Sequence, residues 1–361
     1  MGERHKILVF RIGQLGDSLI SLPAFHAIRA RWPAAHITLL FDQHVGRQWV
    51  LARALLEGTG LVDDYIPYPV GHSAKEKREA LREVLRLIPR LRKERFDWVV
   101  HLEPEFKSVR QSLRDRAFFR LAGIRRQITT VRHRKPRAGG RPLEPLEHET
   151  DFFLRALKAE GFVAPDPGSA TFDLHLGEDD AAGWKALRAD SDVGEKARLV
   201  GVGVGSKMQA KRWPLDRFEK VLMRLIEVFD IVPVFLGGPE DSEASQGLAG
   251  ALGRGIDACG RLSLRGSVAA LADCEFYLGN DTGTMHLAVA AGRRCVVVFS
   301  ARDVPGKWYP YGSGHRVHRV PVDCEGCMLY TCIDQGRKCL MAIGPDEVYQ
   351  SCAQLMESLR D

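Results

Sequence analysis

Apolar runs with the character of β-strands alternate with helical runs along the whole chain, and this alternation constrains the fold more than any other feature. Short runs rich in β-branched residues begin near residues 6, 36, 97, 198, 231, 274 and 295. An alternation of this kind predicts α/β architecture, with parallel sheets covered by helices. At 361 residues, the chain has room for about two such domains.

Helical patterns fill the stretches between these strands. They are expected at 17–31, 45–57, 74–94, 215–229, 241–252, 264–272 and 284–291, with a final helix at 345–359. Pro89 should kink or divide the third of these helices. Residues 133–147 are rich in Pro, Gly and charge and predict a loop, and residues 163–180 resemble the crossing between two halves. The pattern therefore predicts two Rossmann-like domains that face a central cleft.

The composition is that of an ordinary globular protein, with 45% hydrophobic and 27% charged residues. Because the sequence shows neither a membrane-spanning run nor a signal segment, we expect a cytoplasmic protein. The net charge of +6 is uneven: residues 105–141 hold twelve Lys or Arg and two acids. Such a stretch attracts nucleic acid, a phosphorylated glycolipid or a membrane surface, unless it is only a solvated helix face and a loop.

The first glycine loop, in "KILVFRIGQLGDSLISLP" (6–23), places Asp17 at the start of a helix. Aspartate is a preferred residue at a helix N-cap. A carboxylate beside a cleft is also suited to act as general base on a hydroxyl group. Local sequence leaves both roles open.

The segment "GVGVGSKMQAKRWP" (201–214) contains three alternating glycines, but it lacks the spacing and the helix of a dinucleotide fingerprint. Ser206, Lys207, Lys211 and Arg212 follow the glycines. A loop with this composition is suited to an anionic ligand that lies across strand ends, although a basic surface loop would look the same.

"YLGNDTGTMHLAVAAG" (277–292) reads as a strand, a sharp turn and a helix. The unpaired N–H groups of that helix start form a natural phosphate site, to which His286 could contribute a donor. Asp281 or Thr282 could instead only cap the helix. In "FLGGPEDSE" (235–243), the acids favour a helix start but could equally bind ribose hydroxyls.

Four of the eight cysteines, Cys324, Cys327, Cys332 and Cys339, lie within 16 residues of one another. Four thiols at this separation could hold a structural zinc or iron ion, but the spacing fits no standard zinc ribbon. Free or oxidisable thiols are the alternative.

Taken together, these motifs resemble glycosyltransferase family 9, the heptosyltransferases of bacterial lipopolysaccharide assembly. The resemblance rests on "ILVFRIGQLGDSLISLPAFHAIRARWP", "KRWP", "GNDTGTMHLAVAAG" and "KWYPYG", in this order. It implies a GT-B fold, with an acceptor domain at 1–175, a nucleotide-sugar domain at 176–344 and a last helix, 345–361, that packs back on the first domain. The implied reaction is an inverting sugar transfer without a catalytic metal, most often from ADP-heptose to an anionic glycolipid at the inner membrane face.

The resemblance also implies roles for single residues. Asp17 matches the catalytic base, and Arg11 and Gln14 lie where the acceptor binds. The donor is expected to contact Ser206, Lys207, Lys211, Glu240, Leu262, Asp281, Thr282, Gly283 and His286. Within this set, Lys211 binds the diphosphate, Glu240 the ribose, with Asp241 as a competing alignment, and Leu262 the nucleobase.

Three alternatives stay open. The "SARD" run at 300–303 departs from the family pattern, so the donor could be a UDP- or GDP-sugar. A non-catalytic polyanion-binding protein would use the basic stretch, although no nucleic-acid recognition module is present, and we expect no nucleic-acid partner. A nicotinamide oxidoreductase is disfavoured by the missing fingerprint.

Overall fold

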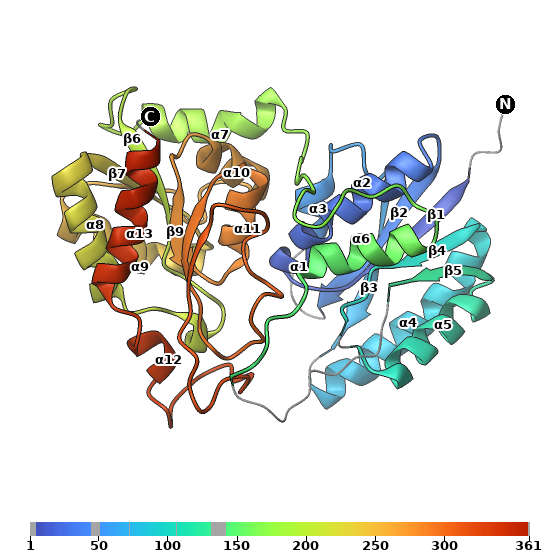
Figure 1. Cartoon of the computed structure of the whole chain (residues 1–361). Helices are drawn as coiled ribbons and strands as arrows, with labels where there is room; N and C mark the ends of the chain where they lie inside the picture. The colour runs from blue at the N-terminus through green and yellow to red at the C-terminus, as the bar shows by residue number, and fades with distance from the viewer. Residues whose placement is uncertain (1–4, 45–50, 72, 106, 131–141, 360–361) are drawn as a thin grey trace. The chain divides into compact units, whose positions relative to one another are not determined.

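The computed structural model describes residues 5–44, 51–71, 73–105, 107–130 and 142–359 (Figure 1). By its internal contacts the chain divides into two compact units. The first consists of Met1–Ala138 and Glu149–His175, and the second of Gly139–His148 and Leu176–Asp361. Each unit is built around its own parallel sheet.

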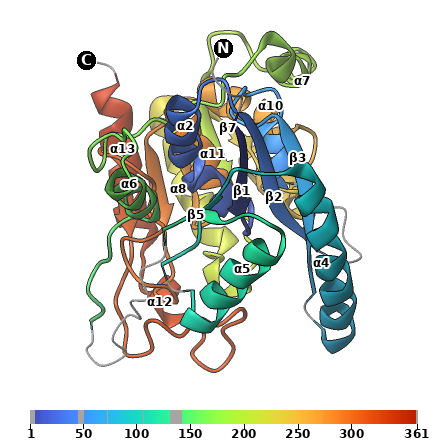
Figure 2. The same cartoon turned by 90° about the vertical axis from the view of Figure 1, so that its right-hand side faces the viewer.

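The first unit has a five-stranded sheet in the order β3-β2-β1-β4-β5, with every neighbouring pair parallel. The strands are β1 (Lys6–Arg11), β2 (His36–His44), β3 (Asp64–Val70), β4 (Trp98–His101) and β5 (Arg126–Thr129). The helices are α1 (Leu15–Ile20), α2 (Leu22–Arg31), α3 (Leu51–Leu56), α4 (Ala74–Glu94), α5 (Val109–Leu121) and α6 (Glu149–Ala159). Helices α4 and α5 pack against each other, as α1 does against α3 and α2 against α6 (Figures 1 and 2).

Three differences from the sequence prediction in this unit involve prolines. The helix expected at 17–31 breaks at Ser21, and Pro23 lies at the second position of α2, where no intrahelical N–H bond is lost. Pro89 does not divide α4, which runs unbroken from Ala74 to Glu94. Strand β3 was not predicted because its sequence, DYIPYPV, carries two prolines, which sheets tolerate at an edge such as the one that β3 occupies.

The second unit has a six-stranded parallel sheet in the order β11-β10-β9-β6-β7-β8. Its strands are β6 (Arg198–Gly203), β7 (Ile231–Phe235), β8 (Ile256–Asp257), β9 (Tyr277–Asn280), β10 (Cys295–Val298) and β11 (Arg316–His318). Its helices are α7 (Glu178–Ala189), α8 (Leu215–Phe229), α9 (Ser242–Leu252), α10 (Leu264–Ala272), α11 (Gly283–Ala290), α12 (Lys338–Met341) and α13 (Pro345–Ser358), with 3₁₀ turns η1 (Gln209–Lys211) and η2 (Pro239–Asp241). Helix α7 occupies part of the stretch that the sequence had suggested as a crossing.

The last helix, α13, packs into the core of the second unit. Val348, Cys352 and Met356 recur at intervals of four residues, are completely buried, and belong to the same apolar cluster as Phe218 and Leu222 of α8. Contacts with α8 and β10 position the helix (Figure 1). The apolar side of α13 is therefore used within the second unit, and the expected packing of residues 345–361 on the first domain stays a prediction.

The glycines of β6 and of the loop that follows it make room for side chains. A Cβ atom on Gly201 would lie 2.7 Å from Leu271, and one on Gly203 would lie 2.0 Å from the Tyr277 hydroxyl oxygen. A Cβ on Gly205 would lie 2.0 Å from the Asp241 carboxylate. The alternating glycines therefore serve packing across the sheet, in agreement with the absence of a dinucleotide fingerprint.

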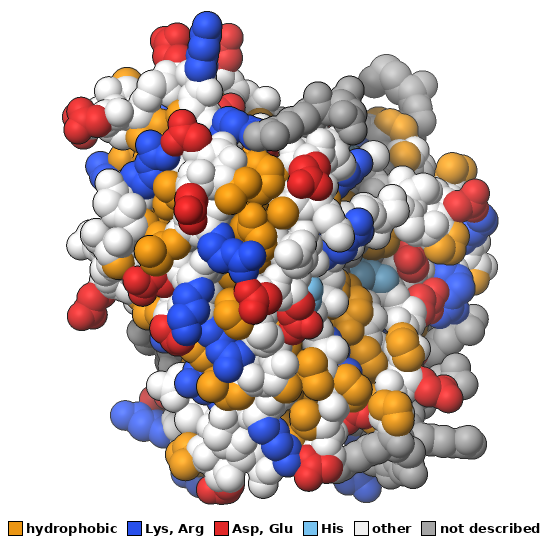
Figure 3. All heavy atoms as spheres, turned by 60° about the vertical axis from the view of Figure 1, so that its left-hand side comes forward, with side chains coloured by type: hydrophobic (Ala, Val, Ile, Leu, Met, Phe, Trp, Pro, Cys, Tyr) orange, Lys and Arg blue, Asp and Glu red, His pale blue; other side chains and the backbone are white. Residues whose placement is uncertain are grey.

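None of the helices in the described ranges has both the length and the apolar composition that a membrane span requires. On the face drawn in Figure 3, acidic and basic side chains are interspersed, with hydrophobic side chains scattered among them.

We predict that Gly203→Ala lowers the free energy of unfolding by about 1–3 kcal/mol, because the new methyl group overpacks the site against Tyr277. The buried Tyr277 hydroxyl has no hydrogen-bond partner among the described residues, so Tyr277→Phe should be nearly neutral alone and should restore part of the stability of Gly203→Ala. Chemical denaturation of the single and double variants measures both effects. A double variant no more stable than Gly203→Ala would contradict this packing account.

Candidate functional site

The candidate site of the second unit lies at the carboxyl edge of its sheet. The loops that follow β6, β7, β9 and β10 all start at this edge, since the strands are parallel. Strand β6 lies between β7 and β9, so the strand order reverses there. Open α/β sheets bind ligands at such a switch point.

Lys211 joins three of these loops. It ends η1 in the loop after β6, and its Nζ atom lies 2.6 Å from Oδ2 of Asp281, which directly follows β9. The same Nζ lies 3.2 Å from Oδ2 of Asp303, in the loop after β10. The structure thus brings together two predicted donor residues and adds Asp303, which sequence reasoning missed. Its position shortly after a buried strand, within the SARD run at 300–303, is the sequence signal that could have revealed it.

The charges in this cluster are shielded from water. Burial alone would lower the pKa of Lys211, but the attraction of Asp281 and Asp303 raises it above the usual value, so the ammonium group stays charged. Burial also raises the pKa of the Asp281 carboxyl group. A charged ammonium group at reduced exposure interacts strongly with any anion that reaches it.

Asn280 fixes the Lys211 loop against the end of β9. Its side-chain amide donates to the carbonyl of Val204 at 2.7 Å, and its Oδ1 atom accepts from the N–H of Trp213 at 3.0 Å. Both partners belong to the chain segment that carries Lys211. Asn280 is completely buried, and its bridging role was not predicted.

Helix α11 starts beside this cluster. Thr282 is its N-cap residue, with Gly283 and Thr284 as the first helical positions, so their N–H groups have no intrahelical partner. His286 lies one turn further on and is buried; burial, followed by the nearby charges of His148 and Lys211, lowers its pKa to about 3. The imidazole is therefore neutral at physiological pH and could donate one N–H bond, but it adds no positive charge.

The loop after β7 distinguishes Glu240 from Asp241. The Asp241 carboxylate accepts from the N–H of Gly238 at 3.1 Å and packs over Gly205, and burial raises its pKa. Glu240, by contrast, is exposed. The structure therefore favours Glu240 as the side chain available to a ligand.

Three other predicted donor residues lie in the second unit. The Ser206 hydroxyl is buried and accepts from the N–H of Met208 at 3.3 Å, and Lys207 is half-buried beside it. Leu262 is half-buried, next to Gly183 of α7 and Gly266 of α10. These placements leave the three roles as predictions.

Asp17 belongs to the first unit and lies at the carboxyl end of β1. It is the third residue of α1, and its Oδ2 atom accepts from the N–H of Gln14, the N-cap residue, at 2.7 Å. Asp17 therefore secures the helix start from inside the first turn, not from the cap position. Its side chain is 28% exposed, so solvent or a ligand can still reach the carboxylate.

Arg11 holds Asp17 in place. The Arg11 side chain is 2% exposed, lies over the ring of Phe153, and donates to the carbonyls of Leu102 and Asp17. Its Nη2 atom is also 3.3 Å from Oδ1 of Asp17. This burial favours orientation of Asp17 over the predicted direct contact with an acceptor, whereas Gln14 is exposed.

A second charged group, missed by sequence reasoning, follows β4. The Glu103 carboxylate is 3% exposed and pairs with Lys107, which also pairs with Asp115. Although burial raises the pKa of Glu103, the nearby imidazole of His101 and the ammonium group of Lys107 lower it to about 2. A carboxylate so strongly stabilised as an anion is a poor proton acceptor, so Asp17 is the better candidate base of this unit.

The four clustered cysteines are free thiols of intermediate exposure. Across the described ranges, no three His, Cys, Asp or Glu side chains come together in a group able to hold a metal ion. The arrangement of Cys324, Cys327, Cys332 and Cys339 therefore does not fit the predicted zinc or iron site and is compatible with the thiol alternative.

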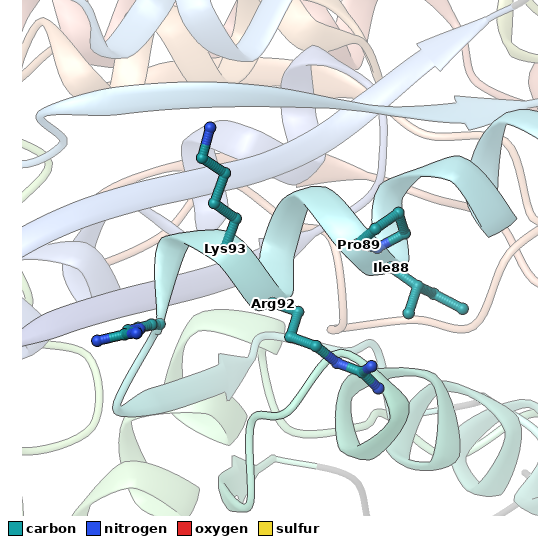
Figure 4. A pocket seen from close by; sticks show the side chains of 5 residues that line it. Ile88, Pro89, Arg92 and Lys93 are labelled. Atoms are coloured by element: carbon teal, nitrogen blue, oxygen red, sulfur yellow. The ribbon is translucent and has the colours of Figure 1, made fainter.

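A basic hollow lies along the second half of α4 (Figure 4). It is lined by Ile88, Pro89, Arg92, Lys93 and Arg95. Arg92 also donates a hydrogen bond to the carbonyl of Leu121, at the end of α5. The hollow combines three cations with two apolar side chains, a composition suited to a phosphate group attached to an apolar body.

Comparisons with known proteins agree with this description. The model of glycosyltransferase family 9 (heptosyltransferase) matches residues 166–337. Lipopolysaccharide heptosyltransferase 2 of Salmonella typhimurium is 28% identical over 304 residues, which cover 81% of this chain and 82% of that protein.

Two solved structures are similar over nearly the whole chain. A family 9 glycosyltransferase from Veillonella parvula has a TM-score of 0.73 at 21% identity, covering 98% of this chain and 97% of its own. The ADP-heptose lipopolysaccharide heptosyltransferase II of Escherichia coli has a TM-score of 0.70 at 20% identity, covering 99% of this chain and 100% of its own. The expected GT-B fold class and the resemblance to family 9 are thereby confirmed.

We predict that His286 makes the protein less stable in mild acid. Its folded pKa of about 3 lies below the unfolded value of 6.5, so its contribution is complete above pH 6.5 and is lost as the pH falls towards 3. At pH 5 the loss should be about 2 kcal/mol. Denaturation of wild type and His286→Gln at pH 7 and pH 5 isolates this contribution. The wild type should lose more stability than the variant, and equal losses would show that His286 is not buried as a neutral group.

Proposed function

We propose that this chain, a glycosyltransferase similar to family 9, transfers heptose from ADP-heptose to a lipopolysaccharide core or a related bacterial surface glycan. The proposed transfer inverts the configuration at the reacting carbon of the sugar and uses no catalytic metal. The observation that carries the proposal is the convergence of Lys211, Asp281 and the start of α11 at one sheet edge.

The donor diphosphate is assigned to this edge because its charge matches the groups there. The Lys211 ammonium group and the N–H groups at the start of α11 would neutralise the negative charge that develops on the leaving diphosphate. Glu240, exposed after β7, would accept from the ribose hydroxyls, and Leu262 would lie against the base. The name of the similar Escherichia coli enzyme gives ADP-heptose as its donor, which supports the same donor for this chain.

The acceptor hydroxyl needs a base, and Asp17 is the group we propose for it. Arg11 fixes the backbone of Asp17, while the carboxylate keeps an exposed fraction. Removal of the hydroxyl proton makes the oxygen a stronger nucleophile towards the sugar carbon, whose bond to the diphosphate breaks on the opposite side. A UDP- or GDP-sugar would use the same groups, so binding of ADP, UDP and GDP distinguishes the three possible donors.

A surface of the first unit suits an anionic membrane or glycolipid. Helix α4 carries eight Lys or Arg against four Glu, and α5 carries four Arg against one Asp, which is buried. Large apolar side chains are exposed on the same two helices: Leu81, Leu85, Val109, Leu113 and Leu121. Apolar side chains among arginines are typical of surfaces that lie on anionic lipids. We therefore propose that the α4–α5 surface contacts the membrane that holds the acceptor.

We predict that Asp17→Asn lowers kcat at least a hundredfold while ADP affinity changes little, because a general base acts on the transition state. Lys211→Ala should instead weaken ADP binding roughly tenfold or more. Initial rates with ADP-heptose and calorimetric titration with ADP separate the two effects. Asp64→Asn and Lys220→Ala are matched controls at exposed positions of the same units and should behave as wild type. A wild-type rate for Asp17→Asn would remove the base assignment.

We predict that Leu81→Glu lowers partitioning into vesicles of mixed neutral and anionic phospholipid roughly fivefold, because it removes an apolar contact and adds a negative charge. Val163→Glu makes the same kind of change at a side chain that is 87% exposed outside α4 and α5. This control should sediment with the vesicles as wild type does. Equal losses in both variants, or no vesicle binding by wild type, would contradict the proposed surface.

A further inference from the structure

Arg302, part of the run that departs from the family pattern, is buried and uses its guanidinium group on three acceptors. Its Nη1 atom donates to Oδ2 of Asp303 at 2.5 Å. Its Nε and Nη2 atoms donate to the carbonyls of Leu329 and Met328 at 2.7 and 2.8 Å. The guanidinium group thus joins the loop after β10 to the segment Cys324–Cys339, which carries the clustered cysteines. This segment is here called the cysteine-bearing segment.

Asp303 is shared between two cations. One oxygen, Oδ2, lies 2.5 Å from Arg302 and 3.2 Å from the Nζ atom of Lys211. The Asp303 main-chain carbonyl accepts from Arg319 at 3.2 Å. The Asp303 side chain is 12% exposed, so these contacts are only weakly screened by water.

Backbone hydrogen bonds reinforce the same connection. The N–H of Gly326 donates to the carbonyl of Ala301 at 2.8 Å, and the N–H of Met328 donates to that of Arg302 at 3.1 Å. On the other side, the N–H of Ala210 donates to the carbonyl of Tyr330 at 3.0 Å. The cysteine-bearing segment therefore contacts both the Asp303 loop and the residue that precedes Lys211.

We propose that Arg302 and Asp303 are positioning residues that hold the Lys211 ammonium group where the donor diphosphate binds, and that the cysteine-bearing segment anchors them. This inference rests on the proposed function, since it assumes that Lys211 binds the diphosphate. Arg302 acts only through Asp303, and Asp303 acts through Lys211.

The alternative role for Asp303, a simple counter-charge, gives the opposite result. Lys211 and Arg302 carry two positive charges, and Asp281 and Asp303 carry two negative ones. If only charge mattered, removal of the Asp303 charge would leave the cluster positive and would tighten the binding of an anion. If Asp303 positions Lys211, its removal leaves the ammonium group held by Asp281 alone, and binding weakens because the lysine side chain must be ordered again.

Calorimetric titration with ADP decides between the two roles. Asp303→Asn should weaken ADP binding roughly tenfold, although it removes a negative charge from the site. Asp334→Asn makes the same charge change at an exposed position of the cysteine-bearing segment and should bind ADP as wild type does. Unchanged or tighter binding by Asp303→Asn would overturn the inference.

Arg302→Lys tests the anchor, because it keeps the charge but cannot reach three acceptors with a planar fork. It should weaken ADP binding, and wild-type affinity would show that charge alone suffices. The double variant Arg302→Lys/Asp303→Asn should bind ADP no more weakly than Asp303→Asn, because both changes break the same series of contacts from Arg302 through Asp303 to Lys211. If the losses of ADP affinity in the two single variants add up in the double variant, Arg302 does not act through Asp303.

Thermal melting of each variant without ligand confirms that the protein compared is folded. If wild type binds none of ADP, UDP and GDP, the proposed function fails. If wild type binds and the Arg302 and Asp303 variants bind equally well, only the positioning role fails.

Discussion

One ammonium group, that of Lys211, connects three strand ends of the second unit. It is paired with Asp281 after β9 and Asp303 after β10, while its own segment leaves β6 and is secured by Asn280. Placing these like and unlike charges together at low exposure is favourable only because each is paired. The positions of Asp281 and Asp303 at this edge are therefore tied to that of the lysine.

In the first unit, too, buried contacts hold a charged side chain in place, and here the side chain is that of Asp17. A buried guanidinium group, that of Arg11, fixes the backbone of Asp17, and the N–H of Gln14 fixes one carboxylate oxygen. Gly13 allows this approach, because a Cβ atom there would lie 2.4 Å from the Asp17 side chain. The question of whether Asp17 supports a helix or accepts a proton thus has a joint answer: the contacts that support the helix also orient the carboxylate that we propose as the base.

Sequence reasoning was accurate where the signal is local and periodic. It predicted the main strands of both sheets, the glycine loops after them, and the neighbourhood of Lys211 and Asp281. It missed β3, whose prolines hide an edge strand, and the short strands β5, β8 and β11. It also missed the roles of Asn280, Arg302 and Asp303, which depend on contacts across many residues of sequence. It did not reveal that α13 contributes to the core of the second unit, because an apolar helix face shows that a helix is buried but not which surface covers it.

The most direct test of this account is the melting temperature of the wild-type protein with ADP, UDP, GDP or NAD, each near millimolar concentration. A ligand that binds only the folded state adds about 2.7 kcal/mol of stability at 100 times its dissociation constant. We predict that ADP raises the melting temperature more than the other three nucleotides. A melting temperature unchanged by every nucleoside diphosphate would contradict the proposed donor site at Lys211.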